Sequence, residues 1–191
     1  MMTSLNKKIN KKGFTIVETL VAVTILMIAI AGPLSVASRG LSASIYARDQ
    51  MTATFLAQES MEIIKNTRDN TIARVGADRW MDDLVQCITT PENGQCDAGF
   101  QGINDMIAFR CPIVGDTPGC KLYLINGYYT QYQQDGAIPT QFYRYFSLTN
   151  NNTLPRNDSY MEKTVTVVVS WRAGGVPYRV ELASQLLNVL R

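Results

Sequence analysis

The stretch Lys11-Lys12-Gly13-Phe14-Thr15-Ile16-Val17-Glu18, followed by an apolar run, decides the fold of this 191-residue chain. No charged residue occurs from Thr19 to Ala37, and about 20 apolar residues are enough to cross a bilayer as a helix. A charged group near the centre of a bilayer costs roughly 2.5–3.5 kcal/mol on insertion scales. Glu18, at the start of this run, is therefore predicted to be a functional group that needs a partner.

The net charge of +2 comes from a short N-terminal tail. Residues 1–13 contain four lysines and no acidic residue, so the rest of the chain has a net charge of −2. This remainder lacks the basic surface that nucleic-acid binders use. The chain has no histidine, which is the commonest general base and metal ligand, and it has no Walker, Rossmann or Gly-x-Ser-x-Gly motif. We expect neither an enzyme, a cofactor nor a metal site.

The apolar run predicts a membrane anchor whose basic flank, Lys7 to Lys12, stays in the cytoplasm. An ordinary secretory signal with a cleavage site at Ser35-Val36-Ala37 is the alternative, but it leaves Glu18 unexplained. The helical pattern also continues beyond this point, because Ala53, Leu56, Ala57 and Ile64 lie on one helical face. We expect one helix from Phe14 to about Asn66. Gly32 and Pro33 predict either a kink in it or a segment that unwinds when subunits pack.

The four cysteines lie in one window and predict two disulfides in an exported domain. They are Cys87, Cys96, Cys111 and Cys120. Two local pairs, Cys87 with Cys96 and Cys111 with Cys120, are one arrangement. A nested arrangement, Cys87 with Cys120 and Cys96 with Cys111, is the other.

The remaining sequence predicts an antiparallel sheet that packs on the amphipathic half of the long helix, which is an α+β fold. Arg79 to Ile88 is expected to form a short helix, with Trp80, Leu84 and Ile88 on one side. Thr89 to Gly119 is expected to be irregular and held by the disulfides. Four or five strands follow, and they are expected at Lys121–Ile125, Tyr128–Gln133, Phe142–Thr149, Thr164–Trp171 and around Tyr178–Leu182. Asn126-Gly127 and Ala173-Gly174-Gly175 provide the turns.

A cluster of aromatic residues in the strand region has two interpretations. Alternation along strands places half of such residues in the core, whereas an exposed set would form an adhesive or stacking surface. The cluster comprises Tyr128, Tyr129, Tyr132, Phe142, Tyr143, Tyr145 and Phe146.

The segment from Lys11 to Leu20 resembles the signal of type IV prepilins and type II secretion pseudopilins. The resemblance extends through the apolar run to about Ala37, and the rest of the helix has the same character. It implies that a membrane peptidase cuts between Gly13 and Phe14, that the new Phe14 amine is methylated, and that Glu18 acts in assembly. Cleavage creates a cation at Phe14, which would pair with Glu18 of a neighbouring subunit or of its own chain. Alternatively, Glu18 lies at the interface in contact with water. The ending, a Val-rich strand that reaches Trp171, a glycine turn and then Val180-Glu181-Leu182, looks like that of minor pilins and pseudopilins. The family often closes its C-terminal loop with a disulfide, whereas here the cysteines precede the expected sheet.

The predicted organisation is a leader at 1–13, a membrane and assembly segment at 14–37, an amphipathic helix at 38–66, disulfide-stapled loops at 67–120 and a sheet at 121–191. The resemblance implies a structural subunit of a pilus-like surface filament, in which Gly32 and Pro33 help helices to pack. Its partners would be other pilin-like subunits, the prepilin peptidase and methylase, and an inner-membrane assembly platform with its ATPase. Nucleic acid would be a partner only if the filament is a DNA-uptake pilus. A secretion pseudopilin and a monomeric, membrane-anchored extracellular binding protein are the alternatives.

Overall fold

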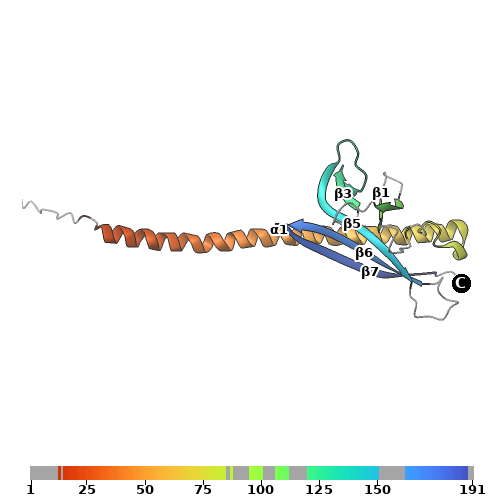
Figure 1. The fold of residues 1–191 in the computed structure, drawn as a ribbon, viewed down its shortest axis with the longest axis horizontal. Coiled ribbons are helices and arrows are strands. Elements are labelled where there is room, and N and C mark those ends of the chain that lie inside the picture. The colour runs from red at the N-terminus through yellow and green to blue at the C-terminus, as the bar shows by residue number, and fades with distance from the viewer. Residues whose placement is uncertain are drawn as a thin grey trace, which may run out of the picture. The chain divides into compact units, whose positions relative to one another are not determined.

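The computed structural model describes residues 13, 15–84, 87, 95–100, 106–111, 120–150 and 162–188. The chain divides into one unit at Met1–Tyr46 and a second at Ala47–Arg191. The helix α1 spans Ile16–Val75 and so contributes to both (Figure 1). Everything described below for the sheet and its core belongs to the second unit.

Helix α1 is longer than predicted. The expected end near Asn66 is wrong, because the polar residues that follow it are satisfied within the helix. The Thr67 hydroxyl donates to the carbonyl of Ile63 at 2.8 Å, and the side-chain amide of Asn70 donates to Asn66 Oδ1 at 2.9 Å. The helix ends instead at Val75, where Gly76 adopts a φ of 93°, a conformation that favours glycine.

Where a helix was predicted at Arg79–Ile88, the described residues 79–84 form turns and the end of a 3-10 helix. A 3-10 helix, η1, covers Ala77–Arg79, and hydrogen bonds that span three residues follow it, including Leu84 N to Met81 O at 2.8 Å. Such bonds belong to turns and 3-10 structure, whereas an α-helix requires a span of four residues. Trp80 and Leu84 are nevertheless buried as predicted, and Ile88 lies outside the described residues.

The interval Thr89–Gly119 is not irregular throughout, as predicted, because it contains two strands. β1 spans Gln95–Phe100 and β2 spans Met106–Cys111, and the two strands pair antiparallel from Gln95↔Cys111 to Phe100↔Met106. The density of glycine and proline around these strands concealed them. The cysteines therefore do not all precede the sheet, since Cys96 lies within β1 and Cys111 ends β2.

The five predicted strands are present and, with β1 and β2, form one seven-stranded antiparallel sheet. They are β3 at Cys120–Ile125, β4 at Tyr128–Thr130, β5 at Ile138–Asn150, β6 at Glu162–Ala173 and β7 at Val176–Leu187. β5 is the central strand. It pairs with β3 and β1 through such partners as Arg144↔Cys120 and Phe146↔Cys96, and with β6 through Arg144↔Val169 and Phe146↔Val167.

The core of the second unit lies between α1 and one face of the sheet. Ala53, Leu56, Ala57 and Ile64 of α1 are buried as the helical periodicity predicted. Alternate residues of β6 meet this face, and they are Val165, Val167, Val169 and Trp171. Figure 1 shows β5, β6 and β7 beside the part of α1 that carries this face. The α+β fold predicted from the sequence is confirmed.

Candidate functional site

The N-terminal end of α1 is capped by a side chain. Thr15 Oγ1 accepts a hydrogen bond from the backbone N–H of Glu18 at 3.3 Å, which places Thr15 at the N-cap and Glu18 at the third helical position. Thr-x-x-Glu is the sequence of a capping box, a signal that the sequence analysis missed. Glu18 also lies in the first helical turn, where the helix dipole favours a negative charge.

The predicted processing site lies immediately before this cap. Gly13 is exposed and lies outside regular secondary structure, whereas Phe14 lies outside the described residues. Glu18 is exposed as well, and within the described part of the chain it makes no ion pair. Its predicted pairing with the Phe14 amine therefore remains a prediction.

The part of α1 in the first unit contains a long apolar run, from Thr19 to Ala37. Helix α1 contains an 18-residue window with a mean hydropathy of 2.4, none of it buried, and every described residue from Thr15 to Tyr46 is exposed. The hydroxyls of Thr19 and Thr24 donate to the carbonyls of Ile16 and Val21, both at 2.8 Å. A helix whose hydroxyl groups are satisfied internally is suited to lipid.

Gly32 and Pro33 do not interrupt α1, because helical structure continues on both sides of them. The structure contains no unwound segment at this point. A methyl group added at Gly32 would meet no atom within 4 Å, so the helix surface is open here. Small residues at such a surface permit another helix to approach closely. The role of Gly32 and Pro33 in assembly remains a prediction.

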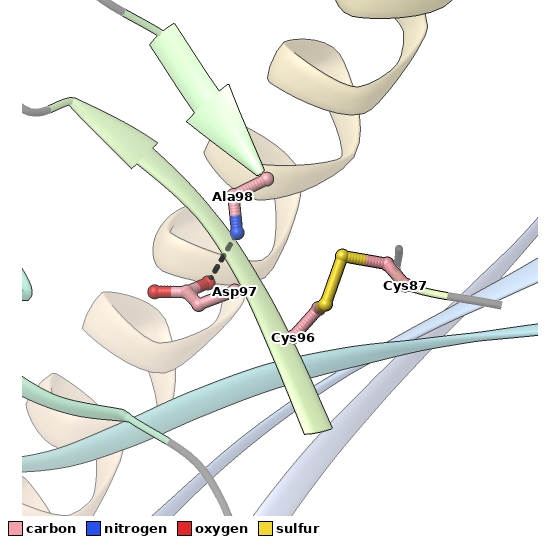
Figure 2. The surroundings of a disulfide bond; sticks show 4 residues. All are labelled: Cys87, Cys96, Asp97 and Ala98. Atoms are coloured by element: carbon pink, nitrogen blue, oxygen red, sulfur yellow. Dashed lines mark hydrogen bonds between the residues drawn. A yellow bond between two sulfur atoms is a disulfide. The ribbon is translucent and has the colours of Figure 1, made fainter. Parts of the chain in front are cut away.

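One of the predicted disulfides is described in full. Cys87 and Cys96 are joined, with a Cα–Cα distance of 5.6 Å, so the nested arrangement is wrong and the local pairing of these two residues is confirmed. Cys120 is also disulfide-bonded, whereas the side chain of Cys111 lies outside the described residues. Figure 2 shows that Cys96 and Asp97 point to opposite sides of β1. The bond therefore fixes β1 from one side and leaves Asp97 on the other.

A buried cluster of charged groups joins α1 to the sheet, and the sequence analysis missed it. Arg144 of β5 and Asp97 of β1 both have 0% exposure, and Arg144 Nε donates to Asp97 Oδ1 at 2.8 Å. Arg144 Nη1 donates to the Leu56 carbonyl at 3.0 Å and to Glu59 Oε2 at 3.1 Å. Arg144 Nη2 donates to the Ala98 carbonyl at 2.9 Å, so that one guanidinium links three elements.

The charges of this cluster act on each other. Burial raises the pKa of Asp97 to about 6, although the Arg144 guanidinium and the Ala98 N–H both act to lower it. Burial lowers the pKa of Arg144, but Asp97 and Glu59 outweigh this effect and raise it overall. The sequence contained a signal for this cluster. Arg144 lies between Phe142 and Phe146 on alternate positions of β5 that face the core. A cation at an inward strand position must be paired.

The cluster leaves no room for a side chain at Gly99. A methyl group there would collide with the Gln131 amide and would lie 2.9 Å from Arg144 Nη2. Glycine in the interior of a strand often marks such a close approach. This arrangement supports the packing of the second unit.

Among the described residues, no group of three or more His, Cys, Asp or Glu side chains is placed to hold a metal ion. The acidic residue Asp83 is instead paired within the protein. Arg74 Nη2 donates to Asp83 Oδ2 at 2.6 Å and Thr71 Oγ1 donates to the same oxygen at 2.7 Å. These two hydrogen bonds lower the pKa of Asp83.

Comparison with known proteins bears on the N-terminal segment. Residues 8–32 match the family described as the prokaryotic N-terminal methylation motif. The match covers Gly13, Phe14, Glu18 and Gly32, and it ends one residue before Pro33. Searches of curated proteins and of solved structures give no match. The chain therefore carries the prepilin-type cleavage and methylation signal of type IV pilin-like proteins, and its long helix with an antiparallel sheet has the layout of that class.

Proposed function

We propose that this chain is a structural subunit of a type IV pilus-like surface filament. The observation that supports the proposal is the methylation motif at residues 8–32, continuous with an apolar helix whose described side chains are exposed from Thr15 to Tyr46. Exposed leucine, isoleucine and valine side chains require lipid or other helices as their surroundings. A subunit that is stored in a membrane and then packed into a filament has each of these surroundings in turn.

The proposed sequence of events begins in the membrane. The chain crosses the bilayer once, with Lys7 to Lys12 in the cytoplasm and the second unit exported. A prepilin peptidase cleaves the peptide bond between Gly13 and Phe14, and a methylase modifies the new amine. In this proposal the chain is a substrate of enzymes and has no catalytic role.

Assembly then depends on the first turn of α1. After cleavage, Thr15 is the second residue of the mature chain, and its cap on the N–H of Glu18 keeps the helix ordered close to the new terminus. The Phe14 amine of one subunit pairs with Glu18 of its neighbour, because an uncompensated carboxylate in lipid is costly. The open surface at Gly32 allows neighbouring helices to approach closely.

The first test is the processing step. The full chain is co-expressed with a prepilin peptidase, and the mass of its N-terminal peptide is measured. We expect a new terminus at Phe14 for the native chain and loss of cleavage for Gly13→Leu, because a bulky side chain would occupy the scissile position. Gly40→Leu, at an exposed glycine of the same helix, is the matched control and should be cut normally.

The outcomes of this test separate the candidate functions. An uncut native chain, or a cut after Ala37, would contradict the proposal and favour a secreted or simply anchored protein. A cut after Gly13 followed by recovery of the chain in sheared surface filaments supports the pilus-like subunit. Recovery only with a secretion apparatus would support the pseudopilin alternative.

A further inference from the structure

The outer face of the sheet, on the side away from the core, carries a hollow with a volume of about 410 Å³. Cavities of about 300–1,000 Å³ are typical of small-ligand sites. Strands β3, β5, β6 and β7 all contribute to its lining. A site built across four paired strands has a fixed geometry, because its members are held by the sheet itself.

The strand register places one row of polar and aromatic residues directly across this hollow. Lys121 of β3 pairs with Tyr143 of β5, Tyr143 pairs with Ser170 of β6, and Ser170 pairs with Arg179 of β7. Directly opposed residues on neighbouring strands have Cβ atoms about 4.5–5.5 Å apart and lie on the same face. The row therefore presents a cation, an aromatic ring, a hydroxyl and a second cation in sequence.

The same alternation divides the aromatic cluster between two faces. Phe142 and Phe146 are buried in the core, whereas Tyr143 and Tyr145 are only partly buried and line the hollow. The core interpretation is therefore confirmed for Phe142 and Phe146, whereas an adhesive or stacking role of Tyr143 and Tyr145 remains a prediction. Tyrosine rings provide an apolar platform together with a hydroxyl that bonds to a ligand.

The charges of the hollow are unbalanced toward positive. Lys121, Arg172 and Arg179 line it, and none of the described residues that line it is acidic. Glu181 pairs with Arg179 at 3.3 Å. Lys121 Nζ lies 5.9 Å from the centroid of the Tyr143 ring. Arg172 is exposed and, among the described residues, makes no ion pair. At least one guanidinium is thus available to a ligand carboxylate, with which arginine makes two parallel hydrogen bonds.

The hollow also contains polar groups suited to a ligand rich in hydroxyls. Ser170 Oγ is buried and has no hydrogen-bond partner among the described residues. Thr140 and Gln141 provide a further hydroxyl and an amide at the lining. A buried hydroxyl without a partner costs free energy, and a ligand hydroxyl that reaches it would recover this loss.

We propose that the hollow between Lys121, Tyr143, Ser170 and Arg172 binds a carboxylate-bearing sugar ring of an acidic polysaccharide. The tyrosine rings stack against the apolar face of the sugar, Ser170 bonds to a ring hydroxyl, and Arg172 and Lys121 bind the carboxylate. Single-stranded nucleic acid fits less well, because it requires a continuous basic groove. Here Glu181 adjoins the row, and the chain after Gly13 has a net charge of −2.

The test uses the full chain in a polyoxyethylene detergent, because a detergent with a sugar headgroup would compete for the site. Tetragalacturonic acid is titrated by calorimetry and by tryptophan fluorescence, to which Trp171 at the lining contributes. Maltotetraose is the neutral probe of equal length, and a thymidine decanucleotide is the nucleic-acid probe. We expect saturable binding of tetragalacturonic acid, with an affinity at least tenfold higher than that for either other probe.

Variants locate the site. Arg172→Gln is expected to weaken binding about tenfold, since it removes the charged donor that binds the ligand carboxylate. Tyr143→Leu, which removes the ring and keeps an apolar side chain, should weaken binding by a similar factor. Lys65→Gln, at a cation of α1 that pairs with Glu62, is the matched control and should bind as the native chain does.

Four results would overturn the proposal. They are no binding of tetragalacturonic acid, equal binding of maltotetraose, tighter binding of the decanucleotide, and binding that neither Arg172→Gln nor Tyr143→Leu weakens. Near-ultraviolet circular dichroism of each variant shows whether it is folded, and both substitutions lie outside the core. The measurement uses unassembled chains, so its result does not depend on whether the filament proposal holds.

Discussion

At the scale of single residues, Arg144 is the most consequential side chain of the second unit. It is fully buried, and its guanidinium makes hydrogen bonds to two carboxylates and two backbone carbonyls. A paired charge in the interior stabilises little compared with an apolar side chain of the same size, but removal of one partner is costly. The cluster therefore specifies how α1, β1 and β5 meet.

We predict that Arg144→Met lowers the free energy of unfolding of the second unit by about 3–5 kcal/mol. The substitution leaves Asp97 buried without its cation and removes one hydrogen bond from each of two carbonyls. Urea unfolding followed by the fluorescence of Trp80 and Trp171 measures the effect. The double variant Arg144→Met, Asp97→Leu should recover a large part of the loss, and a double variant no more stable than the single one would contradict this account.

The pKa of Asp97, about 6 and above its ordinary value of 3.8, predicts how stability depends on pH. The folded protein retains this proton in the range in which the unfolded chain has lost it, so ionisation of Asp97 favours unfolding. The contribution of Asp97 to stability therefore falls as the pH rises from about 4 to about 6, and changes little above that range.

We expect the difference in unfolding free energy between the native chain and Asp97→Asn to shift in favour of Asp97→Asn as the pH rises from 4 to 6. Urea titrations at intervals across this range measure it. The contribution of Asp83 to stability depends on pH in the opposite direction. Its pKa is lowered in the folded protein, so this contribution is lost as the pH falls below about 4. A pH-independent difference between the two proteins would show that Asp97 does not titrate in this range.

At the scale of elements, the disulfide between Cys87 and Cys96 connects the turns after α1 to strand β1. The bond closes a loop with a sequence separation of 9, and both cysteines are buried. β1 pairs with β5 only at Cys96 and Phe146, whereas it pairs with β2 along its whole length. The covalent bond therefore compensates for the limited pairing of β1 with the centre of the sheet.

We predict that the double substitution Cys87→Ser, Cys96→Ser lowers the free energy of unfolding by about 2–4 kcal/mol, which is typical for loss of a disulfide. Non-reducing peptide mapping should recover Cys87 and Cys96 in one linked peptide pair from the native chain. Reduction of the native chain, which also breaks the disulfide of Cys120, should cost at least as much stability as the double variant loses. Recovery of both as free thiols from the exported protein would contradict the pairing.

At the scale of the whole molecule, the proposed filament role depends on the first turn of α1, which contains Glu18. We predict that Glu18→Ala is cleaved after Gly13 but enters filaments much less than the native chain, because the carboxylate that pairs with a neighbouring Phe14 amine is absent. Immunoblots of sheared filaments and of membranes measure the partition. Glu62→Ala, at an exposed acid of the second unit that pairs with Lys65, is the control for loss of a carboxylate elsewhere, and normal incorporation of Glu18→Ala would remove the pairing argument.

The sequence predicted the elements whose signals are local. Periodicity located α1 and its buried face, and alternation with Asn126-Gly127 and Gly174-Gly175 located β3 to β7. It failed where local signals conflict. The Asn66–Asn70 stretch remains helical because its side chains are satisfied within the helix, and β1 and β2 form among glycines and prolines because they pair with each other.

The sequence by itself determined the N-terminal cleavage and methylation signal of this protein. Its parts, the basic tail, the Gly13–Phe14 junction, Glu18 and the apolar run, are adjacent in the chain. Tertiary structure alone decided the environment of Arg144 and the composition of the outer hollow. Asp97 and Arg144 lie 47 residues apart, and Lys121, Tyr143, Ser170 and Arg179 come from four strands. Only strand pairing brings such residues together, since register is a property of the folded sheet and not of any one segment.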